Sequence, residues 1–172
     1  RQSGFDYGLT LGAERANGRS VINNPSSPDW RVDRDGYGQS SAQARLGWQL
    51  LAGHRLEALA GRHRTRADFD DRYASADQDS VATTVIRTSQ VAWLADWVPG
   101  LKAQYRLGES STEVLSESSG YLRAKTRTHT ALAQHDWQRG PHGVQVLLEN
   151  RVDRMSAAYD GTSSFEGPEP RR

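Results

Sequence analysis

The feature that most constrains this chain is a repeated alternation of apolar and polar residues. Between about residues 37 and 50, every second position is apolar and the positions between are polar or glycine. The apolar set is Ala42, Ala44, Leu46, Trp48 and Leu50. Because successive side chains of a strand point to opposite faces, this period of two predicts a β-strand with one apolar and one polar face.

The same alternation recurs in six further segments of the chain. Three of them are regular and lie at about residues 4–14, 101–110 and 143–153. Three are less regular and lie at about residues 54–65, 84–98 and 123–137. The sequence therefore predicts an all-β chain of about seven strands.

The connections between the predicted strands alternate in length. Short connections with the Gly or Pro of tight turns lie at 51–53, 99–100 and 139–143. Long polar connections lie at about 16–36, 67–82 and 112–122. Strands joined in this way predict an antiparallel up-and-down meander with two unlike ends. Outer-membrane β-barrels have this asymmetry, with short periplasmic turns and longer extracellular loops. We therefore expect a segment of a transmembrane β-barrel.

Four tryptophans are expected toward the end of the meander that carries the short turns. Trp48, Trp97 and Trp137 each precede a short turn by a few residues, and Trp93 lies slightly further from its turn. Indoles gather at membrane interfaces, where the ring has apolar contacts and the N–H finds a hydrogen-bond partner. We predict a membrane-interface girdle; the alternative is the core of a soluble β-sandwich.

Composition argues against several other classes of protein. The 172 residues include 22 basic and 21 acidic side chains, a net charge of +1, which is not the clustered basic excess of a nucleic-acid-binding protein. No apolar run approaches the length of about 18 residues that a transmembrane helix needs. The absence of cysteine excludes disulfides and thiolate metal sites. Neither a nucleophile elbow nor a glycine-rich phosphate loop is present, so we expect no enzyme.

A seven-stranded meander is expected to be part of a larger structure. Its two edge strands would carry unpaired N–H and C=O groups, which are costly in lipid, and bacterial single-chain barrels have even strand numbers. We expect residues 1–158 to form a partial barrel. Residues 159–172 lack a strand pattern and are expected to be a disordered tail outside the barrel.

Several short motifs resemble, in their order and spacing, the early barrel of TonB-dependent outer-membrane cobalamin (vitamin B12) receptors. They lie at 32–37 (Val-Asp-Arg-Asp-Gly-Tyr), 44–48, 64–65, 69–71, 106–111, 125–128 and 149–153. The resemblance extends over roughly residues 3–158. It implies a 22-stranded barrel with an N-terminal plug in the bacterial outer membrane. It also implies active uptake of cobalamin or a related corrinoid, with energy from a TonB complex that contacts a part missing from this sequence.

The same resemblance implies calcium binding by Asp-rich extracellular loops. The matching positions are Asp33, Asp35, Asp70 and Asp79. Calcium takes six to eight oxygen ligands, and carboxylates from two adjacent loops could supply several of them. The alternative is that these residues form solvated turns. Residues 18–20 are Gly-Arg-Ser, without the carboxylate that the family usually has in the first loop. No other cofactor is expected.

Six arginines are expected near the lumenal, polar face of the strands or at its ends. They are Arg45, Arg55, Arg62, Arg87, Arg106 and Arg151. Such charges are usual in the interior of a large barrel, which holds a plug or water.

Two alternatives to a transporter remain open at this point. One is another outer-membrane barrel, such as a siderophore receptor, a porin or a translocator. The other is a soluble β-sandwich that binds carbohydrate or protein. A plug domain upstream would identify the transporter, and a stable monomer in the absence of detergent would identify the sandwich.

Overall fold

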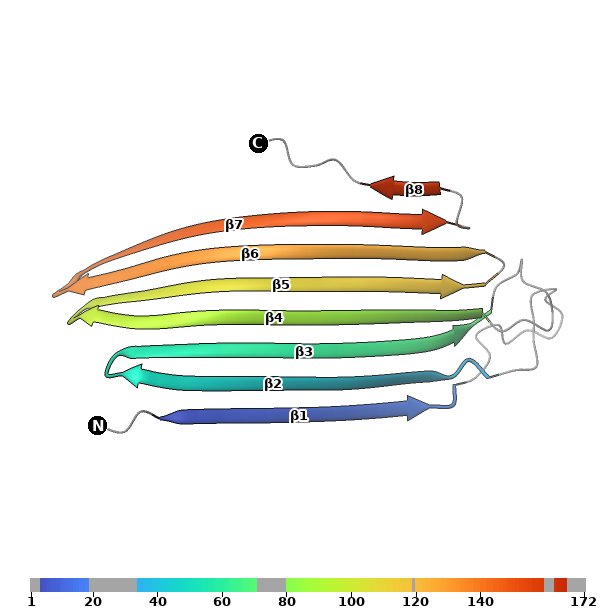
Figure 1. The fold of residues 1–172 in the computed structure, drawn as a ribbon, viewed down its shortest axis with the longest axis horizontal. Helices are drawn as coiled ribbons and strands as arrows, with labels where there is room; N and C mark the ends of the chain where they lie inside the picture. The colour runs from blue at the N-terminus through green and yellow to red at the C-terminus, as the bar shows by residue number, and fades with distance from the viewer. Residues whose placement is uncertain (1–3, 19–33, 71–79, 119, 160–162, 167–172) are drawn as a thin grey trace.

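A computed structural model describes residues 4–18, 34–70, 80–118, 120–159 and 163–166 of the chain. They form one antiparallel sheet in which each strand pairs with the next strand along the chain (Figure 1). The strands are β1 (Phe5–Ala16), β2 (Tyr37–Leu51), β3 (His54–Phe69), β4 (Ser80–Val98), β5 (Leu101–Glu117), β6 (Tyr121–Arg139), β7 (His142–Tyr159) and β8 (Ser163–Glu166). The predicted all-β, up-and-down meander of seven strands is confirmed by β1 to β7. The described residues include no helix that is long and apolar enough to cross a membrane.

The three short connections are two-residue hairpin loops with glycine at the turn. Leu51 pairs with His54, and Val98 and Arg139 pair in the same way with the first residues of β5 and β7. The turn glycines Gly53, Gly100 and Gly140 have φ angles of 81°, 85° and 57°. Residues with a Cβ rarely adopt such positive angles, whereas two-residue hairpin loops often require them. The positions of the three short turns, predicted from these glycines, are therefore confirmed.

The strands extend further toward the long connections than predicted. The expected long connection at 112–122 is wrong, because β5 continues to Glu117 and β6 begins at Tyr121. Thr112 pairs with Thr126 in this region, and Glu113 pairs with Lys125. Both faces carry polar side chains here, and the apolar Val114 and Leu115 are adjacent, so the alternation that marks a strand is lost. Backbone pairing continues regardless, since the ladder hydrogen bonds do not require apolar side chains.

The tail also differs from the prediction. Tyr159 is the last residue of β7, and β8 pairs with the final four residues of that strand. Residues 163–166 thus extend the sheet, although the sequence indicated a tail outside it. The rest of the segment 159–172 lies outside the described residues.

The described residues form a single layer that buries few apolar side chains. The buried apolar residues are the small Ala92, Ala95 and Ala103. By contrast, Leu9 and Leu148 are 67% and 68% exposed. A contiguous apolar surface of this kind marks a face that contacts protein or membrane.

The tips of the short turns are displaced progressively along the strand direction. When the pairing is followed from strand to strand, His54, the first residue of β3, is in register with Val146 of β7. The partners on the strands between them are Ala95, Ala103 and His135. β7 nevertheless begins at His142, four residues beyond Val146. The first two tips also bond to the strand that follows the hairpin: the Asp96 N–H donates to the Gly53 carbonyl and the Gln138 N–H donates to the Gly100 carbonyl, each over 2.7 Å. The tips therefore lie on a diagonal across the sheet (Figure 1).

Candidate membrane-facing surface

The strand register sorts the side chains into two faces. Leu46 pairs with Tyr7 and with Ala58, and the row continues on the other strands. The complete row is Tyr7, Leu46, Ala58, Val91, Leu107, Ala131 and Asn150. We call the face that carries this row the apolar face. The opposite face, which carries Arg45, is the polar face.

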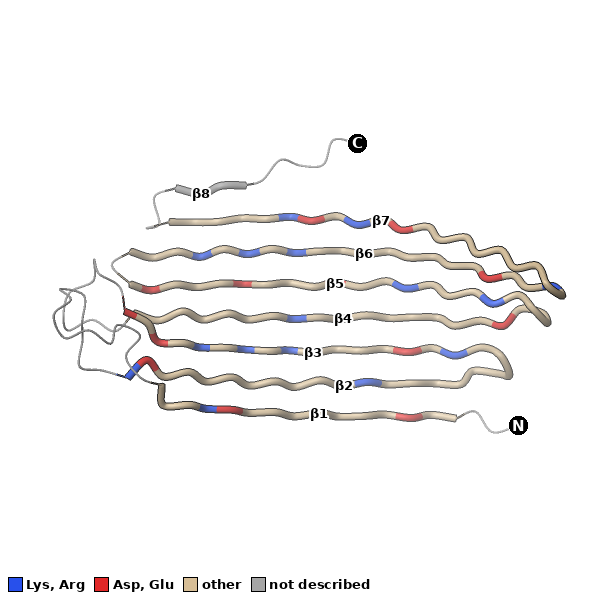
Figure 2. The backbone as a smooth tube through the Cα atoms, turned by 180° about the vertical axis from the view of Figure 1, so that it is seen from behind, with Lys and Arg blue, Asp and Glu red and all other residues tan. Residues whose placement is uncertain are grey.

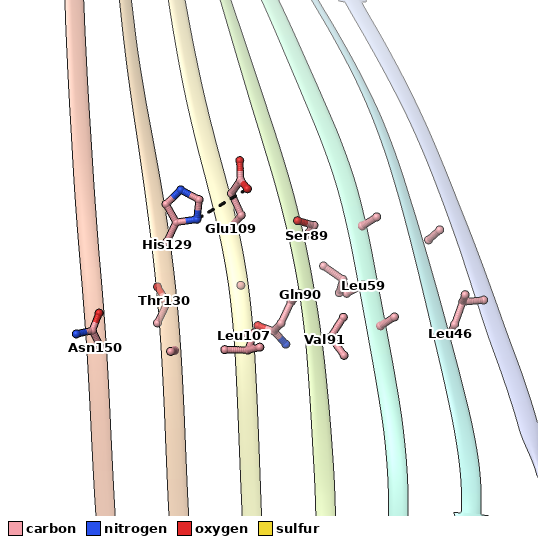
Figure 3. A pocket seen from close by; sticks show the side chains of 15 residues that line it. Leu46, Leu59, Ser89, Gln90, Val91, Leu107, Glu109, His129, Thr130 and Asn150 are labelled. Atoms are coloured by element: carbon pink, nitrogen blue, oxygen red, sulfur yellow. Dashed lines mark ion pairs between the residues drawn. The ribbon is translucent and has the colours of Figure 1, made fainter. Parts of the chain in front are cut away.

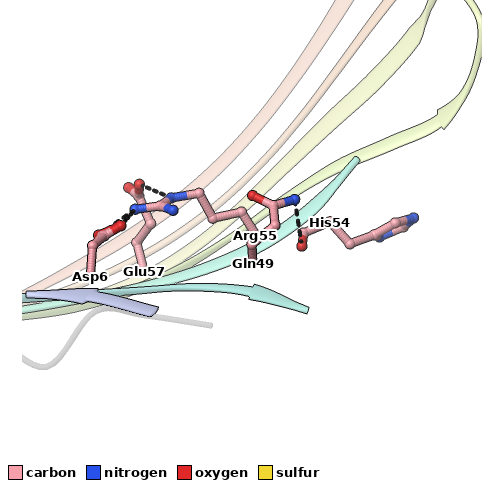
Figure 4. Close-up of polar contacts among 5 residues, drawn as sticks. All are labelled: Asp6, Gln49, His54, Arg55 and Glu57. Carbon is pink, nitrogen blue, oxygen red and sulfur yellow. Dashed lines mark hydrogen bonds and ion pairs between the residues drawn. The ribbon is translucent and has the colours of Figure 1, made fainter. Parts of the chain in front are cut away.

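Hydrogen bonds and ion pairs link neighbouring strands on the polar face near the short turns. The Arg55 guanidinium of β3 donates to Asp6 of β1 and to Glu57, each with one contact of 2.8 Å (Figure 4). Asp136 of β6 accepts hydrogen bonds from Gln134 over 2.8 Å and from Gln145 of β7 over 2.7 Å. These ionised groups occupy one face only, as the sequence alternation predicted.

On the apolar face, an apolar band extends from the short turns toward the middle of the strands. Counting from the short turns, each strand has a last apolar position before polar side chains begin. These positions are Ala13, Ala42, Ala60, Val91, Leu107 and Ala131 on β1 to β6. On β7 the run reaches Leu148, Asn150 interrupts it, and Val152 follows.

The upper limit of the apolar band is nearer the short turns on β4 to β6 than on β1 and β2, and it is level from β4 to β6, where Val91, Leu107 and Ala131 share one row. Ala13 of β1 is in register, through the intervening strands, with Lys125 of β6. The last apolar position on β6 is nevertheless Ala131, six residues nearer the short turns. The limit of the band is thus displaced in the same direction as the turn tips.

All four tryptophans of the predicted girdle lie on the apolar face in the half of the sheet with the short turns. Trp93 and Trp97 contact each other edge to face, with ring centroids 5.3 Å apart. His54 lies 5.1 Å from the Trp97 ring, and Tyr105 stacks on Trp93 at 5.4 Å. Trp48 and Trp137, on other strands, are 49% and 42% exposed. Their role at a membrane interface stays a prediction.

Beyond the apolar band, the strand register places many charged side chains on the same face. Figure 2 shows where the charged residues lie along the strands. One row across the strands contains four arginines, with Ser111 of β5 between the second and third. We call Arg62, Arg87, Arg127 and Arg154 the arginine row. Neighbouring positions on the same face carry Arg64, Arg66, Arg123 and Lys125.

Two of the six arginines do not lie on the polar face. Arg62 and Arg87 lie on the apolar face, whereas Arg45, Arg55, Arg106 and Arg151 lie on the polar face. Arg62 is in phase with Ala58 and Ala60, so its place followed from the alternation of β3. The prediction gave more weight to its charge than to its phase.

The carboxylates of β5 neutralise part of this positive charge. Glu113 accepts a hydrogen bond from Arg123 over 2.8 Å and lies 3.6 Å from Arg87. The hydrogen bond from Arg123 lowers the pKa of Glu113, which lies beyond the apolar band, so this side chain stays ionised. Glu109 lies 3.3 Å from Arg127. Among the described residues, Arg62, Arg64 and Arg154 form no ion pair.

A shallow hollow lies where the apolar band meets the charged zone (Figure 3). Its volume is about 480 Å³. Most of its lining residues belong to the apolar face, including Ala60, Val91 and Ala131, and Glu109 and His129 lie at its charged side. The small side chains between larger neighbours create the hollow.

The predicted calcium ligands are only partly within the described residues. Asp33 and Asp79 lie outside them. Asp35 and Asp70 lie at neighbouring strand ends, because the Asp68 N–H donates to the Gly36 carbonyl over 2.9 Å. The described part of the chain holds no cluster of three or more His, Cys, Asp or Glu residues suited to a metal ion. Calcium binding therefore stays a prediction.

Comparison with known proteins gives no relative: no family model, no curated protein and no solved structure matches this chain.

Proposed function

We propose that this sheet is part of the wall of an outer-membrane β-barrel. The apolar face contacts lipid, and the polar face lines the lumen. One observation carries the proposal: the line of turn tips runs diagonally, and the upper limit of the apolar band is displaced in the same direction between β1 and β6. In a membrane barrel the strands are tilted, so a plane of the membrane crosses the strand register obliquely.

The two displacements correspond to similar average tilts. The turn tips move by four residues over four strand spacings, from β3 to β7. With about 3.3 Å per residue and 4.8 Å between strands, this is a tilt of about 35°. Between β1 and β6 the limit of the apolar band moves by six residues over five spacings, with the whole displacement between β1 and β4. Averaged over the five spacings, that displacement corresponds to about 40°. Strands of outer-membrane barrels tilt by about 35–45°.

The open edges of the sheet support closure with further strands. β1 and the pair β7–β8 form the two edges, and β1 pairs with β2 alone. In lipid, an unpaired backbone edge costs several kcal/mol per group, so a sheet in the membrane closes into a barrel. We propose that strands beyond those described complete this wall.

Among barrels, we propose a TonB-dependent active transporter, with cobalamin or a related corrinoid as its substrate. The order of the motifs at 32–37, 44–48 and 106–111 supports this class. The polar face, with its ionised side chains, suits a lumen that holds a plug and water. A siderophore receptor or a porin is the alternative. A soluble sandwich is less favoured, since no second sheet covers the apolar face among the described residues.

Membrane insertion is tested by reconstituting the chain into phosphatidylcholine vesicles that carry bromine on the acyl chains. We expect strong quenching of tryptophan fluorescence, because the indoles lie on the apolar face. Unquenched emission from a monodisperse protein would reject the membrane assignment. The substrate is tested separately, by titrating the full-length protein with cyanocobalamin and with a ferric siderophore. Binding of the siderophore alone would reject the corrinoid.

A further inference from the structure

We propose that the arginine row binds the phosphate groups of a phosphorylated glycolipid in the outer leaflet. The inference rests on the proposed function, because it requires the apolar face to contact lipid. When only the side chains on the apolar face are counted, each arginine of the row is the first or second position beyond the last apolar side chain of its strand. Arg62, for example, directly follows Ala60 in this alternation. The row thus lies where lipid headgroups would meet the barrel wall.

The register places like charges directly opposite each other. Arg62 of β3 faces Arg87 of β4, and Arg127 of β6 faces Arg154 of β7. Like charges in such positions destabilise a sheet. The carboxylates of β5 offset this repulsion only in part: Glu113 lies 3.6 Å from Arg87, and Glu109 lies 3.3 Å from Arg127. Among the described residues, Arg62 and Arg154 form no ion pair. An anion bound between the facing arginines would offset their repulsion.

Arginine suits phosphate in particular. Its planar guanidinium presents two parallel N–H donors to one phosphate, whereas the lysine ammonium acts as a point charge. Arg62 and Arg87 are both exposed on the apolar face, and Arg87 lies 3.6 Å from Glu113. Two facing guanidiniums can therefore contact a single phosphate group.

The surface beside the row fits acyl chains. The shallow hollow lined by Ala60, Val91 and Ala131 begins next to the arginines and continues into the apolar band. A lipid that carries phosphate groups as well as acyl chains would contact the arginine row and the apolar band together. Inorganic phosphate would contact only the row, and a lipid without phosphate only the band. The combined surface therefore fits a phosphorylated lipid, and two pairs of facing arginines on either side of β5 favour a glycolipid that carries two phosphates.

The test compares binding of three lipids to the full chain in neutral detergent, with bound lipid counted by native mass spectrometry. The lipids are bis-phosphorylated lipid A, its dephosphorylated form, and phosphatidylglycerol. For the variant R62Q/R87Q we expect about tenfold weaker binding of bis-phosphorylated lipid A, since one lost charge-assisted hydrogen bond accounts for roughly that factor. The control R45Q/R151Q loses the same charge from the polar face and should bind within about twofold of the original chain.

Two further variants test the same phosphate recognition if R62Q/R87Q does not fold. R62K/R87K keeps both charges but loses the planar donors, so affinity should fall. E113Q removes a competing carboxylate from Arg87 and Arg123, so affinity should rise. Equal affinity for the dephosphorylated lipid or for phosphatidylglycerol would overturn the inference, as would unchanged binding by R62Q/R87Q.

Failure of this inference is separable from failure of the proposed function. If brominated vesicles quench the tryptophans but lipid A binds without dependence on the arginine row, the barrel wall stands and the lipid site is wrong. If the tryptophans are not quenched, the membrane assignment is wrong, and the lipid site is rejected with it.

Discussion

Replacing Leu46 by arginine tests directly whether the apolar face contacts lipid. Leu46 is 46% exposed and lies within the apolar band, five residues before Leu51 at the end of β2. Five residues advance about 17 Å along a strand, which is about 13 Å above the turn at a tilt of about 40°. This height is close to the middle of an apolar band about 25 Å tall.

The expected effect differs sharply between lipid and water. An arginine at the middle of the membrane lowers the free energy of unfolding of a barrel by about 2–4 kcal/mol. The same change at an exposed position of a soluble sheet alters that free energy by about 0.5 kcal/mol or less. We therefore expect a loss of about 2–4 kcal/mol for Leu46→Arg. The matched control is Gln43→Arg, on the polar face of the same strand, for which we expect about 0.5 kcal/mol or less.

The assay is guanidinium unfolding of the chain in phosphatidylcholine vesicles, followed by tryptophan fluorescence. Leu46→Arg should lower the midpoint without changing the slope, since the surface exposed on unfolding is nearly the same. Equal midpoints for Leu46→Arg and Gln43→Arg would refute the assignment of the two faces. A larger loss for Gln43→Arg would show that the faces are reversed.

Two further predictions concern the turns and the polar face. Gly100→Ala should lower the free energy of unfolding by about 2–3 kcal/mol, because φ is 85° and the new Cβ would lie 2.3 Å from the Gln138 carbonyl oxygen. Gly140→Ala, with φ 57° and no atom within 4 Å, should cost only about 1 kcal/mol, and equal losses in guanidinium unfolding would contradict this reasoning. Arg55→Gln should destabilise the sheet by about 1 kcal/mol or less, since the Asp6 side chain is 47% exposed and solvent screens the pair. Amide exchange should accelerate in β1 for Arg55→Gln, and an equal effect of Arg45→Gln would exclude a specific role for the Asp6 contact.

Alternation located the strands well wherever one face is apolar. The segments predicted at about 37–50 and 101–110 begin at the observed first residues of β2 and β5. It failed where both faces are polar, as at Thr112 and Glu113, because a strand and a polar loop then have the same composition. It also failed for residues 163–166, where pairing with β7 supplies the hydrogen bonds that local sequence does not indicate.

The candidate surface was only partly visible in the sequence. The four tryptophans could be assigned to one face, because their phase within each strand is a local property. The calcium ligands rest on resemblance alone, and two of them, Asp33 and Asp79, lie outside the described residues. The arginine row could not be found from the sequence, since Arg62 and Arg87 are far apart along the chain and were expected near the other face.

By itself, the sequence determined which side chains share a face within each strand and where the short turns lie. Both are local properties, fixed by the period of two and by glycines that accept positive φ. Only the tertiary structure decided how the strands are displaced relative to one another. That displacement is set by pairing between distant segments, and it creates both the displaced limit of the apolar band and the row of facing arginines.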